Sequence, residues 1–505
     1  MTGNLFIRGA RVLTFDETRR DLDCADILIE RGMISAVGPD LVAPEGVPVI
    51  DGAGQLAMPG LINAHFHSPA NLMKGMLDSL PLEIFMLYEV PPLSDVPPPP
   101  ELVRVRTLLG AVEMLKRGIT SVQDDAFFVP GPDPDAIDAL MGAYAASGMR
   151  ATVALDQPNV VEYAKYPFLA DLLPAGEKAR MEAAPRQTGA ELLDLYRHLL
   201  TRWSGAKDGR LGAAVSCSAP HRVTQDYMAA LSQLSREWDV PFYVHMLETR
   251  VQRVFGQEVL GKSLVRYIHD LGMLDERVNL IHGIWLDEPD MDLIADAGAC
   301  IAHNPVCNLR LGSGIMPFRA LSDRNIPICL GTDEALADDG INLWGAIKTA
   351  GLVHNITDPD YRRWPTAQEI LDCAFLGGAR AMRRQQTIGR IMPGYAADIA
   401  MLDLSQINFT PLNDLARQLV YCEDGGSVRR TIVAGRVVME DGKVRGIDEA
   451  ELFAQARELA REHAPALETA RAAAARLEPH YRDMYLRASR TDVGFTRWLE
   501  KGTHP

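Results

Sequence analysis

The sequence lacks the features that mark membrane and secreted proteins. No apolar run approaches the roughly 18 residues that a membrane-spanning helix needs. The start, MTGNLFIRGARVLTFDE, has no apolar stretch of the kind found in a secretory signal. The seven cysteines are scattered, and no two are spaced as CxxC. We therefore expect reduced thiols in a cytoplasmic protein, without a disulfide framework and without a membrane partner.

Positive charge is also scarce. The chain has 51 Lys and Arg residues against 67 Asp and Glu residues, which gives a net charge of -16 at pH 7. Such a surface repels phosphate, so no nucleic acid and no anionic membrane is expected as a partner. Hydrophobic residues make up 47% of the 505 positions, enough for a large core. The composition favours an ordinary globular protein with a small-molecule substrate.

Short strand-like runs separated by turns occur at both ends of the chain. They fill residues 1–57 and return within residues 390–445, as ADIAMLDL and VRRTIVAGRVVMEDGKV. Two similar β-rich pieces that flank everything else predict one small composite β-sandwich, assembled from the N- and C-terminal segments. The last part, residues 446–505, is rich in Ala, Glu and Arg and is expected to be a helical extension that caps the barrel or contacts another subunit.

Residues 58–389 alternate apolar strand-like runs with amphipathic helical stretches. Near-continuous apolar runs are typical of parallel strands covered on both faces. Eight such runs predict an α/β fold of the (β/α)8 TIM-barrel type. The runs are GLINAHFH, ITSVQDDA, RATVALDQ, LGAAVSCSA, PFYVHMLE, VNLIHGIW, ACIAHNPV and IPICLGTDE. The Met- and Phe-rich loops and the helical tail favour a homo-oligomer.

Histidines and an aspartate stand where the predicted strands end. His65 and His67 close the first run, and because side chains alternate along a strand they point to the same face. His245 lies near the end of the fifth run and Asp333 ends the eighth. Barrel enzymes carry their chemistry at this end of the strands. Three nitrogen ligands and one oxygen ligand suit Zn²⁺ or Fe²⁺, so we predict a metal site with zinc as the ion and iron as the alternative.

Five motifs occur in the order seen in the amidohydrolase superfamily: MPGLINAHFH, HMLE, IHG, HNPVCNLRLGSG and GTD. Over roughly residues 3 to 445 the chain resembles the branch of aminohydrolases and chlorohydrolases, which includes S-adenosylhomocysteine/methylthioadenosine deaminases and triazine hydrolases. The resemblance implies the same barrel and composite sandwich. It also implies a single divalent metal held by the residues that match His65, His67, His245 and Asp333.

A single metal is also favoured by a missing lysine. Two-metal members of the superfamily use a modified lysine at the end of the fourth strand as a bridge. Here the fourth run reads RLGAAVSCSAPH and ends without a lysine. Lys207 precedes the run and would lie at the opposite end of the barrel.

The resemblance implies two further catalytic residues, Glu248 as a proton shuttle and His282 as the group that orients or stabilises the reacting oxygen. A divalent ion lowers the pKa of its bound water from about 15.7 to about 7. Asp333 can accept the proton of that water, and the resulting hydroxide attacks an sp² carbon flanked by nitrogens. Glu248 then protonates a ring nitrogen and helps the amine to depart.

The predicted activity is metal-dependent hydrolytic deamination of a nitrogen heterocycle or cyclic amidine, with release of ammonia. One alternative is hydrolytic displacement of chloride or an alkylamine from a heteroaromatic ring at the same site. Another is a non-catalytic scaffold, which is less well supported because every expected ligand is present. The retained Glu248 favours deamination, since an amine is a poor leaving group.

Substrate contacts are predicted for three residues. His221, in APHRVT, resembles the substrate-binding position of the family, with a loop histidine as the alternative. Phe85 stands in the pocket-floor loop, where many relatives have tryptophan. His303, in HNPV, is either a substrate contact or a core histidine.

The segment after the eighth strand is more acidic than in many relatives. It reads GTDEALADDG and contains Glu334, Asp338 and Asp339. These carboxylates favour a cationic or amidine-bearing substrate, with an acidic helix cap as the alternative.

Overall fold

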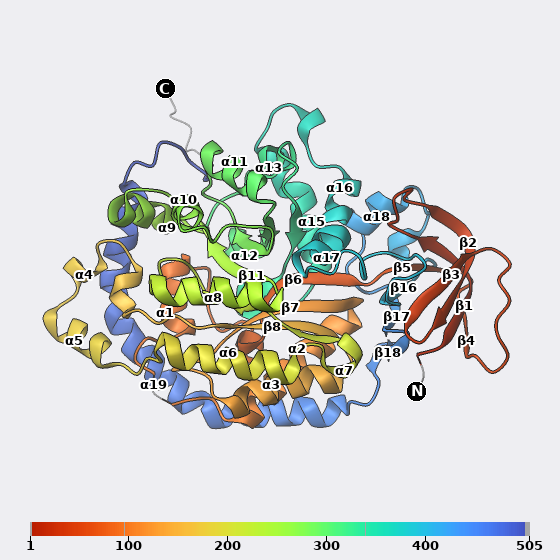
Figure 1. Cartoon of the computed structure of the whole chain (residues 1–505), viewed down its shortest axis with the longest axis horizontal. Helices are drawn as coiled ribbons and strands as arrows, with labels where there is room; N and C mark the ends of the chain where they lie inside the picture. The colour runs from red at the N-terminus through yellow and green to blue at the C-terminus, as the bar shows by residue number, and fades with distance from the viewer. Residues whose placement is uncertain (1–2, 95, 339, 500–505) are drawn as a thin grey trace.

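Eight parallel strand segments close a barrel in the centre of the computed structural model, which describes residues 3–94, 96–338 and 340–499 (Figure 1). Each predicted apolar run forms one of them, and every strand pair between them is parallel. The strands are β6 (Leu61–His67), β7 (Ile119–Phe127), β8 (Arg150–Asp156), β9 (Leu211–Ala213) continued by β10 (Val215–Ser216), β11 (Phe242–Met246), β12 (Val278–His282), β13 (Cys300–His303), and β14 (Ile328–Leu330) continued by β15 (Asp333–Glu334). The predicted fold class is confirmed.

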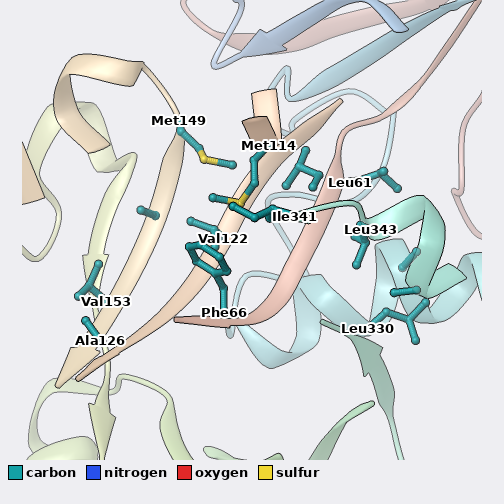
Figure 2. Packing of buried hydrophobic residues seen from close by; sticks show 14 of the residues in the cluster. Leu61, Phe66, Met114, Val122, Ala126, Met149, Val153, Leu330, Ile341 and Leu343 are labelled. Atoms are coloured by element: carbon teal, nitrogen blue, oxygen red, sulfur yellow. The ribbon is translucent and has the colours of Figure 1, made fainter. Parts of the chain in front are cut away.

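Helices follow the strands and cover the outside of the barrel. The covering helices are α2 (Pro100–Lys116), α3 (Pro134–Ser147), α6 (Gly189–Trp203), α8 (Gln225–Trp238), α10 (Leu264–Asp270), α11 (Glu288–Ala297), α13 (Phe318–Ser322) and α15 (Leu343–Val353). Figure 2 shows Phe66 packed near Val122 and Met114 in the main hydrophobic core. Phe66 is fully buried there, on the face of β6 opposite to its neighbours His65 and His67.

The ladder of the eighth strand is interrupted at Gly331, between β14 and β15. A Cβ atom at Gly331 would lie 2.8 Å from the Cβ of His65 and 2.4 Å from the Oδ1 of Asn304. A side chain at this position would therefore hold the eighth strand away from the first. Without one, Asp333 pairs with Phe66 in the sheet and stands beside both histidines of β6.

Strands from both ends of the chain form a second sheet, at the right of Figure 1. Its strand order is β19-β18-β17-β16-β5-β1-β2-β3, with β4 paired to β1. The strands are β1 (Leu5–Leu13), β2 (Asp21–Glu30), β3 (Met33–Gly38), β4 (Val49–Asp51), β5 (Gln55–Pro59), β16 (Ile399–Asp403), β17 (Val428–Val433), β18 (Arg436–Glu440) and β19 (Lys443–Val444). The composite origin is as predicted. The expected sandwich is one continuous mixed sheet in its hydrogen bonding, because β5 pairs directly with β16.

The C-terminal segment forms one long helix, α19 (Glu449–Arg490), which runs along the outside of the barrel (Figure 1). It contacts α2, α1 (Leu82–Glu89), α4 (Leu169–Leu172) and α9 (Arg250–Phe255). The remaining α-helices of the described residues are α5 (Ala175–Ala183), α7 (Ala206–Gly209), α12 (Pro305–Arg310), α14 (Ala335–Asp338), α16 (Ala367–Asp372), α17 (Gly378–Ala381) and α18 (Leu415–Tyr421). Among the described residues, no helix combines the length and apolar character needed to cross a membrane.

A buried ion pair joins the barrel to the mixed sheet. Arg150, the first residue of β8, donates from Nε to Oδ2 of Asp398 at 2.7 Å and from Nη2 to Oδ1 at 3.2 Å. Both side chains are at most 5% exposed. Asp398 lies just before β16 and also accepts a hydrogen bond from the backbone N–H of Ala434. The carboxylate of Asp398 thus joins the N-terminal end of the barrel strands, here called the barrel floor, to two strands of the mixed sheet.

The substitution Asp398→Ala is expected to destabilise the fold by about 3–5 kcal/mol, because it leaves the buried Arg150 cation without a partner. The midpoint of urea unfolding measures the loss. Asp194→Ala is the matched control, since its ion pair with Arg197 is exposed and contributes about 1 kcal/mol at most. Equal midpoints for the two variants would contradict the proposed role of the pair.

Candidate metal and catalytic site

The four predicted ligands converge at the C-terminal end of the barrel strands. The ring centroids of His65 and His67 are 4.6 Å apart, and those of His65 and His245 are 5.0 Å apart. The Oδ1 of Asp333 lies 3.5 Å from the Nε2 of His65 and 3.6 Å from the Nε2 of His67. All four side chains are buried. The potential ligand atoms of the three histidines lie within 4.8 Å of one another, as a metal site requires.

Hydrogen bonds to backbone carbonyls orient two of these imidazoles. The Nδ1 of His245 lies 2.9 Å from the carbonyl of Ser218, and the Nδ1 of His67 contacts the carbonyl of Asp125. When Nδ1–H donates to a carbonyl, Nε2 carries the free lone pair that a metal ion needs. The Nε2 of His65 is buried and has no hydrogen-bond partner. These nitrogen atoms therefore fit a bound cation.

The charges around the histidines also favour a cation. Burial lowers the pKa of a histidine, but the charges of Asp333 and Asp156 outweigh this effect and raise the pKa of His67 to about 9. Burial would raise the pKa of Asp333, yet the neighbouring His65 holds it well below its usual range. Asp333 is therefore a carboxylate, which together with three imidazoles makes a donor set that suits a divalent transition metal.

Two of the residues at the strand ends have an unusual backbone. His282 has φ 74° and Asp333 has φ 60°, a region that side-chain-bearing residues seldom adopt. Such conformations cost energy and are found where the surrounding packing imposes them, often at functional sites. Here they turn the two side chains toward each other, with the Nε2 of His282 3.6 Å from the Oδ2 of Asp333.

Glu248 lies close to the same nitrogen atom of His282, its Nε2. Strand β11 ends at Met246, and Leu247 has φ 48°, so the chain turns and brings Glu248 back over the strand ends. Its Oε1 is 3.5 Å from the Nε2 of His282. Burial, reinforced by the charge of Asp333, raises the pKa of Glu248 to about 8. The side chain therefore carries a proton at neutral pH.

The site opens into a pocket of about 730 Å³, its mouth included. Six of the residues that line it carry carboxyl groups, which are Glu89, Asp156, Glu162, Glu248, Asp333 and Glu334. Lys165 and Arg222 are its cationic lining residues. The lining therefore holds more carboxyl groups than cationic side chains.

The individual acidic residues differ from those expected. Glu334 lines the pocket, Asp338 is not among its lining residues, and Asp339 lies outside the described residues. Glu334 instead shares a hydrogen bond with Glu89, a residue of α1 that the sequence analysis missed. Burial and the charge of Glu89 raise the pKa of Glu334 well above its usual range, so Glu334 holds the shared proton.

Three predicted substrate contacts do not line this pocket. Phe85 is fully buried in a small hydrophobic cluster with Leu311. His303 is buried with its Nε2 3.1 Å from the Nε2 of His354. His221 is buried beside Phe255, one residue before Arg222, which does line the pocket. Substrate-binding roles for these three residues remain predictions that the lining of the pocket does not support.

Comparison with known proteins matches residues 56–438 to the amidohydrolase family. A 5-methylthioadenosine/S-adenosylhomocysteine deaminase of Nitratidesulfovibrio vulgaris is 30% identical over 462 residues, covering 91% of this chain and 97% of that protein. A triazine hydrolase from Arthobacter aurescens has a similar structure, with a TM-score of 0.81, 25% identity, and coverage of 90% of this chain and 99% of that one. An adenosine deaminase from Xanthomonas campestris with bound zinc has a TM-score of 0.79 at 26% identity, covering 92% and 99%.

The substitution Asp333→Ala is expected to lower the metal content of the purified protein to below half an equivalent, because the site loses its charged ligand. Elemental analysis by mass spectrometry measures it. The neighbouring Glu334→Gln serves as the control, since Glu334 is already protonated and the change is isosteric. Full metal content in the Asp333 variant, or an equal loss in both, would contradict the ligand assignment.

Proposed function

Since the chain belongs to the amidohydrolase family, we propose that it hydrolyses the C–N bond of an amino-substituted nitrogen heterocycle and releases ammonia. One observation carries this proposal. A buried Glu248 stands 3.5 Å from His282, beside the three histidines and one aspartate that can hold a metal. Deamination needs these components together, because a nucleophile must be supplied and a poor leaving group must be protonated.

In this proposal His65, His67, His245 and Asp333 hold one divalent ion per chain. When bound, such an ion lowers the pKa of water to about 7 and so makes a nucleophile available at neutral pH. Zinc is the proposed metal because a similar deaminase structure contains it, and iron is the alternative. Asp333, held as a carboxylate by its surroundings, can also accept a proton from the attacking water.

Glu248 is proposed to move the proton that the leaving group needs. Its carboxyl group carries a proton at neutral pH because burial raises its pKa to about 8. It can give that proton to a ring nitrogen of the substrate, take up the proton that Asp333 accepted from the water, and pass that proton to the departing amine. The backbone N–H of Glu248 donates to Oε1 of Gln252 at 3.0 Å, which fixes the turn that carries the side chain.

His282 is proposed to orient the attacking water, with Asn308 as its positioning residue. The Nδ1 of His282 lies 3.0 Å from Oδ1 of Asn308, an atom that can only accept. The proton of the neutral imidazole therefore sits on Nδ1. Its Nε2, which faces Glu248 and Asp333, is left as a hydrogen-bond acceptor for the water.

The acidic pocket favours a substrate that presents N–H donors or positive charge. Amino-substituted purines offer an N–C–NH₂ group, and the curated relatives that act on adenine nucleosides support this class. Glu89, Asp156 and Glu162 would receive its donors. The structural likeness to a triazine hydrolase supports a second candidate, displacement of chloride or an alkylamine from an aromatic ring.

Glu248→Gln is expected to lower kcat/KM for ammonia release by about 10²–10⁴-fold with full metal content, because an amide cannot supply the proton. The assay uses adenosine, 5-methylthioadenosine, S-adenosylhomocysteine, pterins, triazines and cyclic guanidines. The exposed Glu258→Gln is the matched control. If the wild-type protein releases chloride or an alkylamine and no ammonia, the second candidate function replaces the first.

Asn308→Ala is expected to lower kcat about tenfold with a smaller change in KM, since His282 loses the acceptor that sets its tautomer. Asn308→Asp keeps an acceptor oxygen at that position and should recover most of the rate. Steady-state kinetics on the best substrate of the panel compare the two variants. Equal losses of kcat in both variants would contradict the proposal that Asn308 acts by setting the tautomer of His282.

A further inference from the structure

A groove lined by arginines lies at the opposite end of the barrel from the candidate metal site. Arg150 begins β8, whose far end, Asp156, lines the catalytic pocket. Arg210 directly precedes β9, so it also lies at the N-terminal end of the strands. The groove has a volume of about 1000 Å³, its mouth included, and runs between the barrel floor and the mixed sheet. Its five arginines are Arg31, Arg150, Arg210, Arg384 and Arg436.

Elements distant in sequence bring these arginines together. Arg31 lies in the turn between β2 and β3, and Arg436 begins β18 of the same sheet. Arg384 follows α17, the last helix before β16. Arg436 reaches Asp208 in α7, which Figure 1 shows beside the sheet. The groove is therefore built by the junction of the two parts of the fold.

Two of the five arginines are paired with carboxylates. Arg150 binds Asp398, and Nη2 of Arg436 lies 3.3 Å from Oδ2 of Asp208. Those pairs suffice to join the sheet to the barrel floor. Within the part of the chain that the structure describes, the other three arginines of the groove do not take part in joining the sheet to the barrel through an ion pair.

Arg31, Arg210 and Arg384 form no ion pair with any carboxylate among the described residues. Arg210 is only 6% exposed, and in the described part of the chain its guanidinium donates only to the carbonyl of Met149, at 3.0 Å. Holding a buried cation without a carboxylate in direct contact is costly. An anion in the groove would supply the missing charge.

The arginines also repel one another. Burial lowers the pKa of Arg210, and the charges of Arg436 and Arg150 lower it further, while the charges of Asp208 and Asp398 oppose this effect only in part. Burial and the charge of Arg150 lower the pKa of Arg384 in the same way. The chain as a whole has a net charge of -16, so this concentration of positive charge runs against its overall composition.

We propose that this groove binds the phosphate group of a small molecule. Guanidinium groups present several N–H donors in a planar fork that matches the oxygens of a phosphate. A phosphate with two negative charges would neutralise more of the three unpaired cations than a singly charged anion. The groove is larger than a single phosphate, so a phosphate ester fits it better than the free ion.

Calorimetric titration of the full-length wild-type protein with pyrophosphate at low ionic strength tests the proposal. Saturable binding at one site per chain is expected. Arg384→Gln should weaken binding about tenfold, because it removes a charge-assisted contact. Arg31→Gln should also weaken binding, and this residue is exposed, so its loss cannot act by unfolding the protein. Arg482→Gln, on the exposed face of α19, is the matched control and should leave binding unchanged.

Malonate, titrated at matched ionic strength, distinguishes phosphate from carboxylate ligands. Weaker binding of malonate than of pyrophosphate is expected. Equal binding of the two anions would overturn the phosphate assignment. The absence of saturable binding to the wild-type protein, or equal affinity in wild type and Arg384→Gln, would overturn the site itself. Unchanged urea midpoints of the variants establish that they are folded.

Discussion

The close contact between Gly331 and His65 is the constraint on which the candidate site depends. A Cβ at Gly331 would come within 2.8 Å of the Cβ of His65, so only glycine lets the eighth strand lie against the first. Asp333 then pairs with Phe66 and reaches both histidines of β6. The close approach of the Gly331 backbone to the His65 side chain thus decides whether the carboxylate of Asp333 can reach the histidines. The positive φ of Asp333 completes the turn that aims its carboxylate.

Much of this arrangement could be predicted from the sequence, because it follows from local rules. Alternation along β6 places His65 and His67 on one face, and a parallel barrel brings the strand ends to one rim. The same rule, applied to the third strand, would have found Asp156, which ends β8 and lines the pocket. Strand-end position identifies Asp156 but is not sufficient by itself, since His303 ends β13 and contacts His354 instead of lining the pocket.

Residues on the connecting segments could not be predicted in this way. Glu89 reaches the pocket because α1 packs against it, whereas Phe85 of the same helix turns into a hydrophobic cluster with Leu311. Between His221 and Arg222, adjacent in one loop, it is the arginine that faces the pocket. Which of these side chains faces the pocket depends on contacts between segments distant in sequence, and a local sequence pattern does not predict such contacts. The arginine groove has the same origin, since its five arginines come from five separate segments.

The contact between α1 and α19 has a consequence for the order in which the chain becomes structured. Ile84 and Leu87 of α1, the helix that supplies the pocket wall, pack with Leu477 and Tyr481 of α19. These partners stand at opposite ends of the sequence, and closing so long a loop is entropically unfavourable until the barrel between them has formed. During synthesis the ribosome releases α1 early, and it releases α19, which covers α1, only after all eight barrel strands. The packing that covers α1 can therefore be completed only after the strands that carry the candidate metal ligands have been synthesised.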